Sequence, residues 1–185
     1  MRKLVAVISL LILTGVPSAM AQDGPKLGVG AFAGLSFPLV QDDQGQGIEY
    51  GFKGRLGLGS IIVVEPYVSF VKWGEPDPIE GVDLGIDGSK VTAFGIDASL
   101  GNSPGITGIS PYFVIGFGSY KVKNDDTGYD QSKLGFSGGL GLGIGLSPSL
   151  ALDFRGKLIV APQEEGGSKK AVDVVGGLNF SFGGQ

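Results

Sequence analysis

The chain of 185 residues contains no cysteine and no histidine, and only 17% of its residues are charged, against about 25% in an average soluble domain. Without cysteine there is no disulfide, thiolate metal site or thiol nucleophile. Without histidine there is no Ser-His-Asp triad and no histidine metal ligand. The sequence also lacks the G-x-G-x-x-G and Walker motifs that bind nucleotides. These absences predict a protein that is not an enzyme and holds no metal or cofactor.

Glycine, by contrast, is abundant. It occupies 35 of the 185 positions, or about 19% against an average of about 7%. Collagen needs glycine at every third position, and a disordered chain needs low hydrophobicity. Here glycine recurs at every second position in several stretches, and 42% of the residues are hydrophobic. The composition therefore indicates a folded chain, and the length suits one domain.

Residues 1–21 have the features of a cleaved secretory signal peptide. Arg2 and Lys3 precede an apolar run over residues 4–16, and the small residues Ala19 and Ala21 flank Met20 before the expected cleavage site. A membrane anchor is the alternative, but the run has about 13 residues where a spanning helix needs roughly 20. Cleavage after Ala21 shifts the net charge from −4 to −6, which argues against a nucleic-acid partner.

Eight later segments alternate between apolar residues and small or polar residues, which is the period-two pattern of β-strands. Most contain about 9 to 12 residues, the length that crosses a bilayer at a tilt. The expected strands span residues 26–39, 48–58, 62–73, 91–100, 112–120, 134–146, 150–158 and 172–182.

The connections between these segments differ in length. They are short after residues 58 and 146 and intermediate at 101–108, whereas the polar connections at 40–47, 74–88, 124–131 and 162–170 are longer. Short turns at one rim and longer loops at the other are typical of outer-membrane barrels. The sequence thus predicts an all-β fold, an eight-stranded antiparallel up-and-down transmembrane β-barrel that occupies residues 22–185.

Alternation alone does not say which face of each strand points outward. A soluble barrel would place its Leu, Ile and Phe face inside, but the opposite face is mostly Gly, Ser and Ala and would make a poor solvated exterior. We therefore expect the apolar face to meet lipid and the small face to line a narrow lumen, where the few charges nearly neutralise one another. Five acids and four bases are expected to form this lumen charge network: Glu49, Lys53, Arg55, Glu65, Asp97, Asp153, Arg155, Lys157 and Asp173.

The last expected strand ends in Gly177-Leu178-Asn179-Phe180-Ser181-Phe182. With the signal peptide and the eight alternating segments, it resembles the eight-stranded outer-membrane β-barrel family that includes the OmpA transmembrane domain and OmpX. The resemblance covers the whole mature chain and implies a place in the outer membrane of a Gram-negative cell envelope. It also implies that Gly177, Phe180 and Phe182 form a recognition signal for the barrel assembly machinery, although here Gly183-Gly184-Gln185 follows the usually terminal aromatic residue.

Two short segments match functional motifs only formally. Ser137 lies in a G-x-S-x-G sequence of the hydrolase type, but the surrounding residues alternate like a strand and the chain has no histidine to act as base. The acidic run from Asp125 to Asp130 could supply oxygen ligands for Ca²⁺, but its spacing is not that of an EF-hand. We expect solvated surface loops there, with loose divalent bridging to lipopolysaccharide phosphates as the alternative.

Aromatic residues cluster near the strand ends, as they do in the interface girdles of membrane barrels. Strict alternation instead directs four of them into the lumen. These four are Tyr67, Trp73, Tyr112 and Tyr120, and both interpretations stay open at the level of sequence.

The sequence predicts function only in outline. We expect a non-enzymatic, monomeric outer-membrane barrel with a plugged polar lumen and a role in envelope structure and surface contact. Its expected partners are outer-membrane lipid, lipopolysaccharide and the assembly machinery. The alternatives are a small-solute channel, a lipid-modifying barrel enzyme and a soluble periplasmic lipid-binding barrel.

Overall fold

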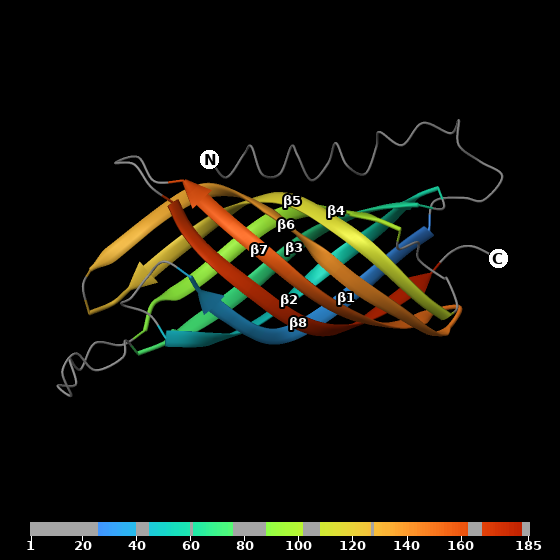
Figure 1. Cartoon of the computed structure of the whole chain (residues 1–185), viewed down its shortest axis with the longest axis horizontal. Coiled ribbons are helices and arrows are strands. Elements are labelled where there is room, and N and C mark those ends of the chain that lie inside the picture. Colours follow the sequence, from blue (N-terminus) through green and yellow to red (C-terminus); the bar gives the residue numbers. More distant parts are fainter. Residues whose placement is uncertain are drawn as a thin grey trace.

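The computed structural model is a closed β-barrel of eight strands (Figure 1). It describes residues 26–39, 45–59, 61–75, 88–101, 108–126, 128–162 and 168–182, and the expected signal peptide lies outside these ranges. Each strand pairs antiparallel with the next one in the chain. The strands are β1 (Lys26–Pro38), β2 (Gly45–Leu58), β3 (Ile62–Gly74), β4 (Lys90–Leu100), β5 (Gly108–Asn124), β6 (Tyr129–Ser147), β7 (Leu150–Pro162) and β8 (Ser168–Phe182).

Pairing between the first and last strands closes the barrel. β1 and β8 run antiparallel from the pair Leu27 and Phe182 to the pair Pro38 and Ala171. Closure leaves no free sheet edge. A sheet that spans lipid must be closed, because lipid offers no hydrogen bonds to exposed backbone groups. All eight predicted strands are present, and the predicted fold class is confirmed.

The two faces of the barrel wall have opposite polarity. Large hydrophobic side chains point outward, for example Leu134 and Phe117, which are 72% and 55% exposed. Charged side chains point inward, and Glu65 is fully buried. A soluble barrel with its apolar face inside is therefore excluded, and the exterior is suited to lipid. Within the described ranges, no helix is long and apolar enough to cross a membrane.

The barrel has two rims, which lie at the right and left of Figure 1. We call the rim where β1 begins and β8 ends the proximal rim, and the opposite one the distal rim. At the distal rim, the connection from β5 to β6 is shorter than the predicted loop over residues 124–131. The two strands stay paired up to Asn124 and Tyr129, so both extend into the range predicted as a loop. Gly128 has a φ of 68°, and Asn124 Oδ1 accepts a hydrogen bond from the Asp126 backbone N–H at 3.0 Å; both features favour a tight turn over a long loop.

Candidate functional site

The nine charged residues predicted for the lumen all point into it, and none has more than 8% of its surface exposed. A buried charge without a partner is strongly destabilising, so the contacts among these side chains decide whether the lumen is stable. The residues are Glu49, Lys53 and Arg55 of β2, Glu65 of β3, Asp97 of β4, Asp153, Arg155 and Lys157 of β7, and Asp173 of β8.

Arg155 is the centre of an ion-pair network that crosses the lumen. Its guanidinium forms ion pairs with Glu65, with Asp97 at 3.0 Å and with Asp153 at 3.5 Å. These three carboxylates belong to β3, β4 and β7. The planar guanidinium fork, which can donate in several directions at once, therefore links separate parts of the barrel wall.

Two bases of β2 complete the network. Arg55 Nε donates to Glu65 Oε1 at 2.8 Å, and Lys53 forms ion pairs with Asp153 and, at 3.4 Å, with Glu65. Ser99 Oγ donates a further hydrogen bond to Glu65 at 3.0 Å. Glu65 is thus contacted by three bases and a hydroxyl group, which compensates its complete removal from water.

Tyr112 packs against the network in space that a glycine provides. Its hydroxyl donates to Asp153 Oδ1 at 2.5 Å and accepts from Arg155 Nε at 3.1 Å. Gly141 of β6 pairs with Tyr112, and a Cβ atom at Gly141 would lie 2.1 Å from Tyr112 Cζ. The lumen is so narrow that a large side chain on one strand requires glycine on its neighbour.

The four aromatic residues whose direction the sequence left open all point into the lumen, where they are 2% to 8% exposed. The hydroxyl groups of Tyr67 and Tyr120 lie 3.1 Å apart, and the ammonium of Lys157 lies 4.3 Å from the centre of the Tyr67 ring. The girdle interpretation is therefore wrong for Tyr67, Trp73, Tyr112 and Tyr120. These side chains fill the barrel instead.

Glu49 and Asp173 stand apart from this network. Across the described residues, neither forms an ion pair within 4.0 Å, whereas the other seven lumen charges all do. In the same ranges, Glu49 Oε2 and both carboxylate oxygens of Asp173 have no hydrogen-bond partner. The two residues lie on β2 and β8, which flank β1 on either side.

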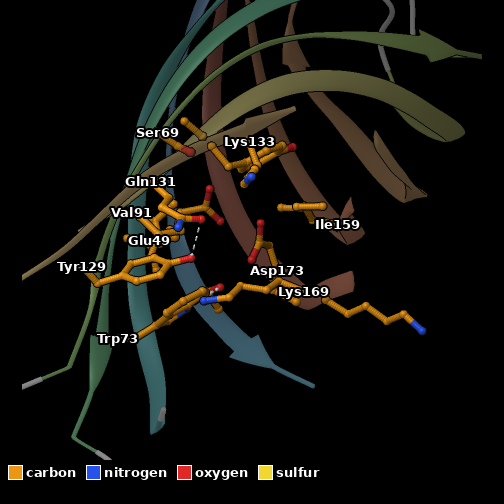
Figure 2. A pocket seen from close by; sticks show the side chains of 18 residues that line it. Glu49, Ser69, Trp73, Val91, Tyr129, Gln131, Lys133, Ile159, Lys169 and Asp173 are labelled. Atoms are coloured by element: carbon orange, nitrogen blue, oxygen red, sulfur yellow. Dashed lines mark hydrogen bonds between the residues drawn. The ribbon is translucent and has the colours of Figure 1, made fainter. Parts of the chain in front are cut away.

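An apolar cavity occupies the distal half of the lumen (Figure 2). It contains about 630 Å³ of space, including its open mouth. Sequence reasoning did not predict it. The signal was present, because the lumen-facing positions change from charged to apolar toward the distal ends of β3, β4 and β7. The walls include Val71, Trp73, Val91, Ala93, Val122, Ile159 and Ala161, and the mouth includes Tyr129, Gln131, Lys133, Lys169 and Lys170.

The structure does not support the hydrolase motif around Ser137. This serine lies within the extended strand β6, faces the lumen and is 8% exposed. A nucleophile elbow instead requires a sharp turn from a strand into a helix. The residues on both sides of Ser137 pair regularly with β5 and β7, so the match is a coincidence of a glycine-rich strand.

In the acidic segment that could have bound Ca²⁺, Asp125 and Asp130 form ion pairs with lysines. Lys90 Nζ lies 2.8 Å from Asp125, and Lys123 contacts the other oxygen of the same carboxylate. Hydrogen bonds from these two lysines lower the pKa of Asp125 to about 2. Asp130 pairs with Lys121 at 3.1 Å. Among the residues that the structure describes, no group of three or more potential metal ligands occurs.

The three residues of the predicted assembly signal lie on β8. Phe180 and Phe182 point outward, are 51% and 45% exposed, and have ring centres 6.2 Å apart. Gly177 lies beside Phe32 of β1, since a Cβ atom at Gly177 would be 3.0 Å from Phe32 Cβ. Their part in assembly stays a prediction.

A closed barrel with a hydrophobic exterior and a buried, charged lumen defines a class, the transmembrane β-barrels. The family model of the outer membrane protein β-barrel domain matches residues 6–183, and the chain belongs to this family. The predicted resemblance is therefore confirmed. A comparison with curated proteins gives no match.

Solved structures of outer-membrane barrels share this fold. Neisserial surface protein A is similar with a TM-score of 0.66 and 14% identity, and the match covers 84% of this chain and 97% of that one. The N-terminal barrel domain of OprF from Pseudomonas aeruginosa is similar with a TM-score of 0.56 and 16% identity over 85% of this chain and 97% of that one. OprG from the same organism is similar with a TM-score of 0.52 and 13% identity, and the match covers 87% of this chain and 97% of that one. At these identities the likeness shows the fold alone.

Proposed function

We propose that the chain is a non-enzymatic structural barrel of the outer membrane whose lumen is closed by the ion-pair network. The observation that supports closure is the reach of two bases across the lumen. Arg155 of β7 contacts carboxylates of β3 and β4, and Lys53 of β2 contacts Asp153 of β7. An eight-stranded barrel is just wide enough for side chains to fill. An ion on its way through would have to break several charge-assisted hydrogen bonds.

Conductance measurements across planar lipid bilayers test this closure. The wild-type protein is expected to give no current steps above the bare membrane. The double variant Lys53→Ala/Arg155→Ala removes both contacts across the lumen and is expected to conduct. The matched control is Lys121→Ala/Lys123→Ala, which also removes two positive charges, but from lysines whose side chains are 52% and 53% exposed. This control is expected to stay silent.

The outcomes separate the two candidate functions. Steady current steps from the wild-type protein would contradict closure and favour a small-solute channel. A double variant that is folded yet silent would contradict the assignment of closure to the ion-pair network. Folding is checked by gel mobility before and after boiling, because a closed barrel migrates differently from its unfolded chain.

We infer that the barrel has no catalytic role. The chain contains no histidine or cysteine. The carboxylates Glu65, Asp97 and Asp153 are tied in ion pairs inside the lumen, where a lipid substrate on the outer surface of the barrel cannot meet them. The expected contribution is instead envelope structure and contact with surface partners at the distal rim.

The proposed partners follow from the surfaces of the barrel. Its hydrophobic exterior is expected to contact outer-membrane lipid, and exposed lysines near the distal rim, such as Lys121 and Lys123, can meet lipopolysaccharide phosphates. Phe180 and Phe182 present a β8 surface suited to recognition by the barrel assembly machinery. The closed sheet leaves no edge for strand pairing with a second copy, which favours a monomer.

A further inference from the structure

The distal cavity has apolar walls and an acidic floor. Its walls include Val71, Val91 and Ile159, whereas Glu49 and Asp173 lie at its inner end. The same two acids also line a smaller cavity that contains Lys53, Glu65 and Arg155, so they stand at the boundary between the apolar space and the ion-pair network. Figure 2 shows both carboxylates turned toward the space that Trp73 and Ile159 border.

The two floor carboxylates are close to one another but have no basic partner of their own. Glu49 pairs across to Gly34 of β1, and Asp173 pairs across to Ser36, so both side chains project over the same stretch of β1. Glu49 is 4% exposed and Asp173 is 2% exposed. The charge of Lys157 reaches both carboxylates, but its ammonium group forms its ion pair with Asp97, at 3.1 Å.

The charges of the lumen leave room for one added cation. The seven groups of the ion-pair network comprise four bases and three acids, so they carry one excess positive charge when ionised. Glu49 and Asp173 contribute two negative charges, which leaves a total of −1. Either one proton shared by these two carboxylates or one monovalent cation bound in place of that proton makes the lumen neutral, as a low-dielectric interior requires.

The hydrogen-bonding capacity of the floor matches a primary ammonium group. Three buried oxygens lack partners, namely Glu49 Oε2 and the two oxygens of Asp173, among the residues that the structure describes. A primary ammonium has three N–H donors and no acceptor. Aromatic rings of Trp73 and Tyr120 line the same cavity and can stabilise a cation further through their π faces.

We propose that the distal cavity is a binding site for small apolar primary amines. The ammonium group lies on Glu49 and Asp173, and the hydrocarbon part fills the space between the valine, isoleucine and tryptophan side chains. This site goes beyond the structural role proposed above, and it does not require that the lumen below it be closed to ions.

Lysines at the mouth make an apolar anion the competing ligand. Lys133, Lys169 and Lys170 border the opening, and Lys169 Nζ lies 4.7 Å from the centre of the Tyr129 ring. Lys170 is exposed and Lys133 and Lys169 are half-buried, so salt, with a screening length of about 10 Å at 0.1 M ionic strength, weakens the field of these lysines. The floor carboxylates are buried and screened much less. We therefore expect the two floor carboxylates, and not the mouth lysines, to decide the charge of the ligand, so that the cavity prefers a cation to an anion.

Trp73 is a built-in reporter for the test, because it is the single tryptophan of the chain and lines the cavity. The full chain, folded in detergent micelles, is titrated at constant ionic strength with hexylamine, hexanoate and hexan-1-ol. These probes share one chain length and differ in charge. Hexylamine is expected to give a saturable change in Trp73 fluorescence, with an affinity at least about tenfold above those of the other two, since hydrogen bonds between charged groups are the strong ones.

Three variants locate the site. Asp173→Asn and Glu49→Gln keep the side-chain sizes and are each expected to weaken hexylamine binding about tenfold. Asp130→Asn removes the same charge from an exposed carboxylate at the distal rim and is expected to leave binding unchanged. Val91→Phe narrows the cavity without touching its acids and is expected to abolish the saturable signal.

Each alternative outcome overturns the proposal. Equal or tighter binding of hexanoate would assign the site to the mouth lysines, and equal binding of hexan-1-ol would reduce it to an apolar space. Undiminished hexylamine binding by a folded Asp173→Asn variant would exclude the floor as the ammonium site. Asp173→Asn removes a buried charge without an ion-pair partner, so it is expected to fold, as gel mobility before and after boiling would show.

Discussion

Replacing Glu65 by glutamine removes the negative charge at the centre of the lumen network while it keeps the size of the side chain. The wild-type carboxylate is fully buried. It accepts a hydrogen bond from Arg55 Nε at 2.8 Å, lies 3.4 Å from Lys53 Nζ and also pairs with Arg155. Glu65→Gln leaves these three bases in place and raises the excess positive charge of the seven-residue network from one to two.

The magnitude follows from these distances. At an effective dielectric constant of about 20, charges about 3 Å apart attract by roughly 5 kcal/mol per pair. Restored hydration of the carboxylate in the unfolded chain offsets much of that attraction, and the loss of one partner of a buried pair costs about 3–5 kcal/mol in practice. We expect Glu65→Gln to lower the free energy of unfolding by that amount, about 3–5 kcal/mol.

Unfolding in denaturant, with the protein inserted in phospholipid vesicles, measures this change. Trp73 fluorescence reports the state of the distal lumen, and gel mobility before and after boiling reports the whole barrel. The control Asp130→Asn breaks an ion pair with Lys121 at 3.1 Å whose partners are about half exposed, so it is expected to cost at most about 1 kcal/mol. If Glu65→Gln were as stable as this control, the reasoning that the lumen network stabilises the barrel would be refuted.

Two further predictions concern the narrow lumen and the distal turn. Gly141→Ala places a Cβ atom 2.1 Å from Tyr112 Cζ and is expected to destabilise the barrel by about 1–3 kcal/mol. In Gly156→Ala the new Cβ has no heavy atom within 4 Å and the change is expected to be neutral or stabilising by up to about 1 kcal/mol; equal unfolding midpoints of the two variants would contradict the packing argument. The pKa of Asp125, about 2 against an ordinary 3.8, means that its ion pairs with lysine are intact above about pH 4 and are lost as the pH falls through 2. NMR titration of this carboxyl group is expected to give a midpoint near pH 2 that rises in Lys123→Ala, and an unchanged midpoint would show that Lys123 does not hold it.

The direction of each strand face was predictable because its cause is local. Charged residues such as Lys53 and Arg55 alternate with bulky apolar residues, and only one assignment of faces gives lipid an apolar surface. The direction of the aromatic residues could not be predicted in this way. Trp and Tyr suit both an interface girdle and a filled lumen, and only the burial of Trp73 and Tyr112 distinguishes them. The β5–β6 loop was predicted too long because the polar residues Asp130 and Gln131 at the start of β6 look like a loop in the sequence.

Alternation, strand length and the balance of lumen charges are properties of single segments, and the sequence by itself determined from them an eight-stranded barrel with its hydrophobic face outward. Which charges meet inside it was decided only by tertiary structure. Closure of β8 onto β1 brings Asp173 beside Glu49, far apart in the chain, and separates both from the bases that satisfy Glu65. The apolar distal cavity likewise exists only because the ends of several strands surround one space. Contacts of this kind depend on strand order, register and the curvature of the closed wall, and no single strand contains that information.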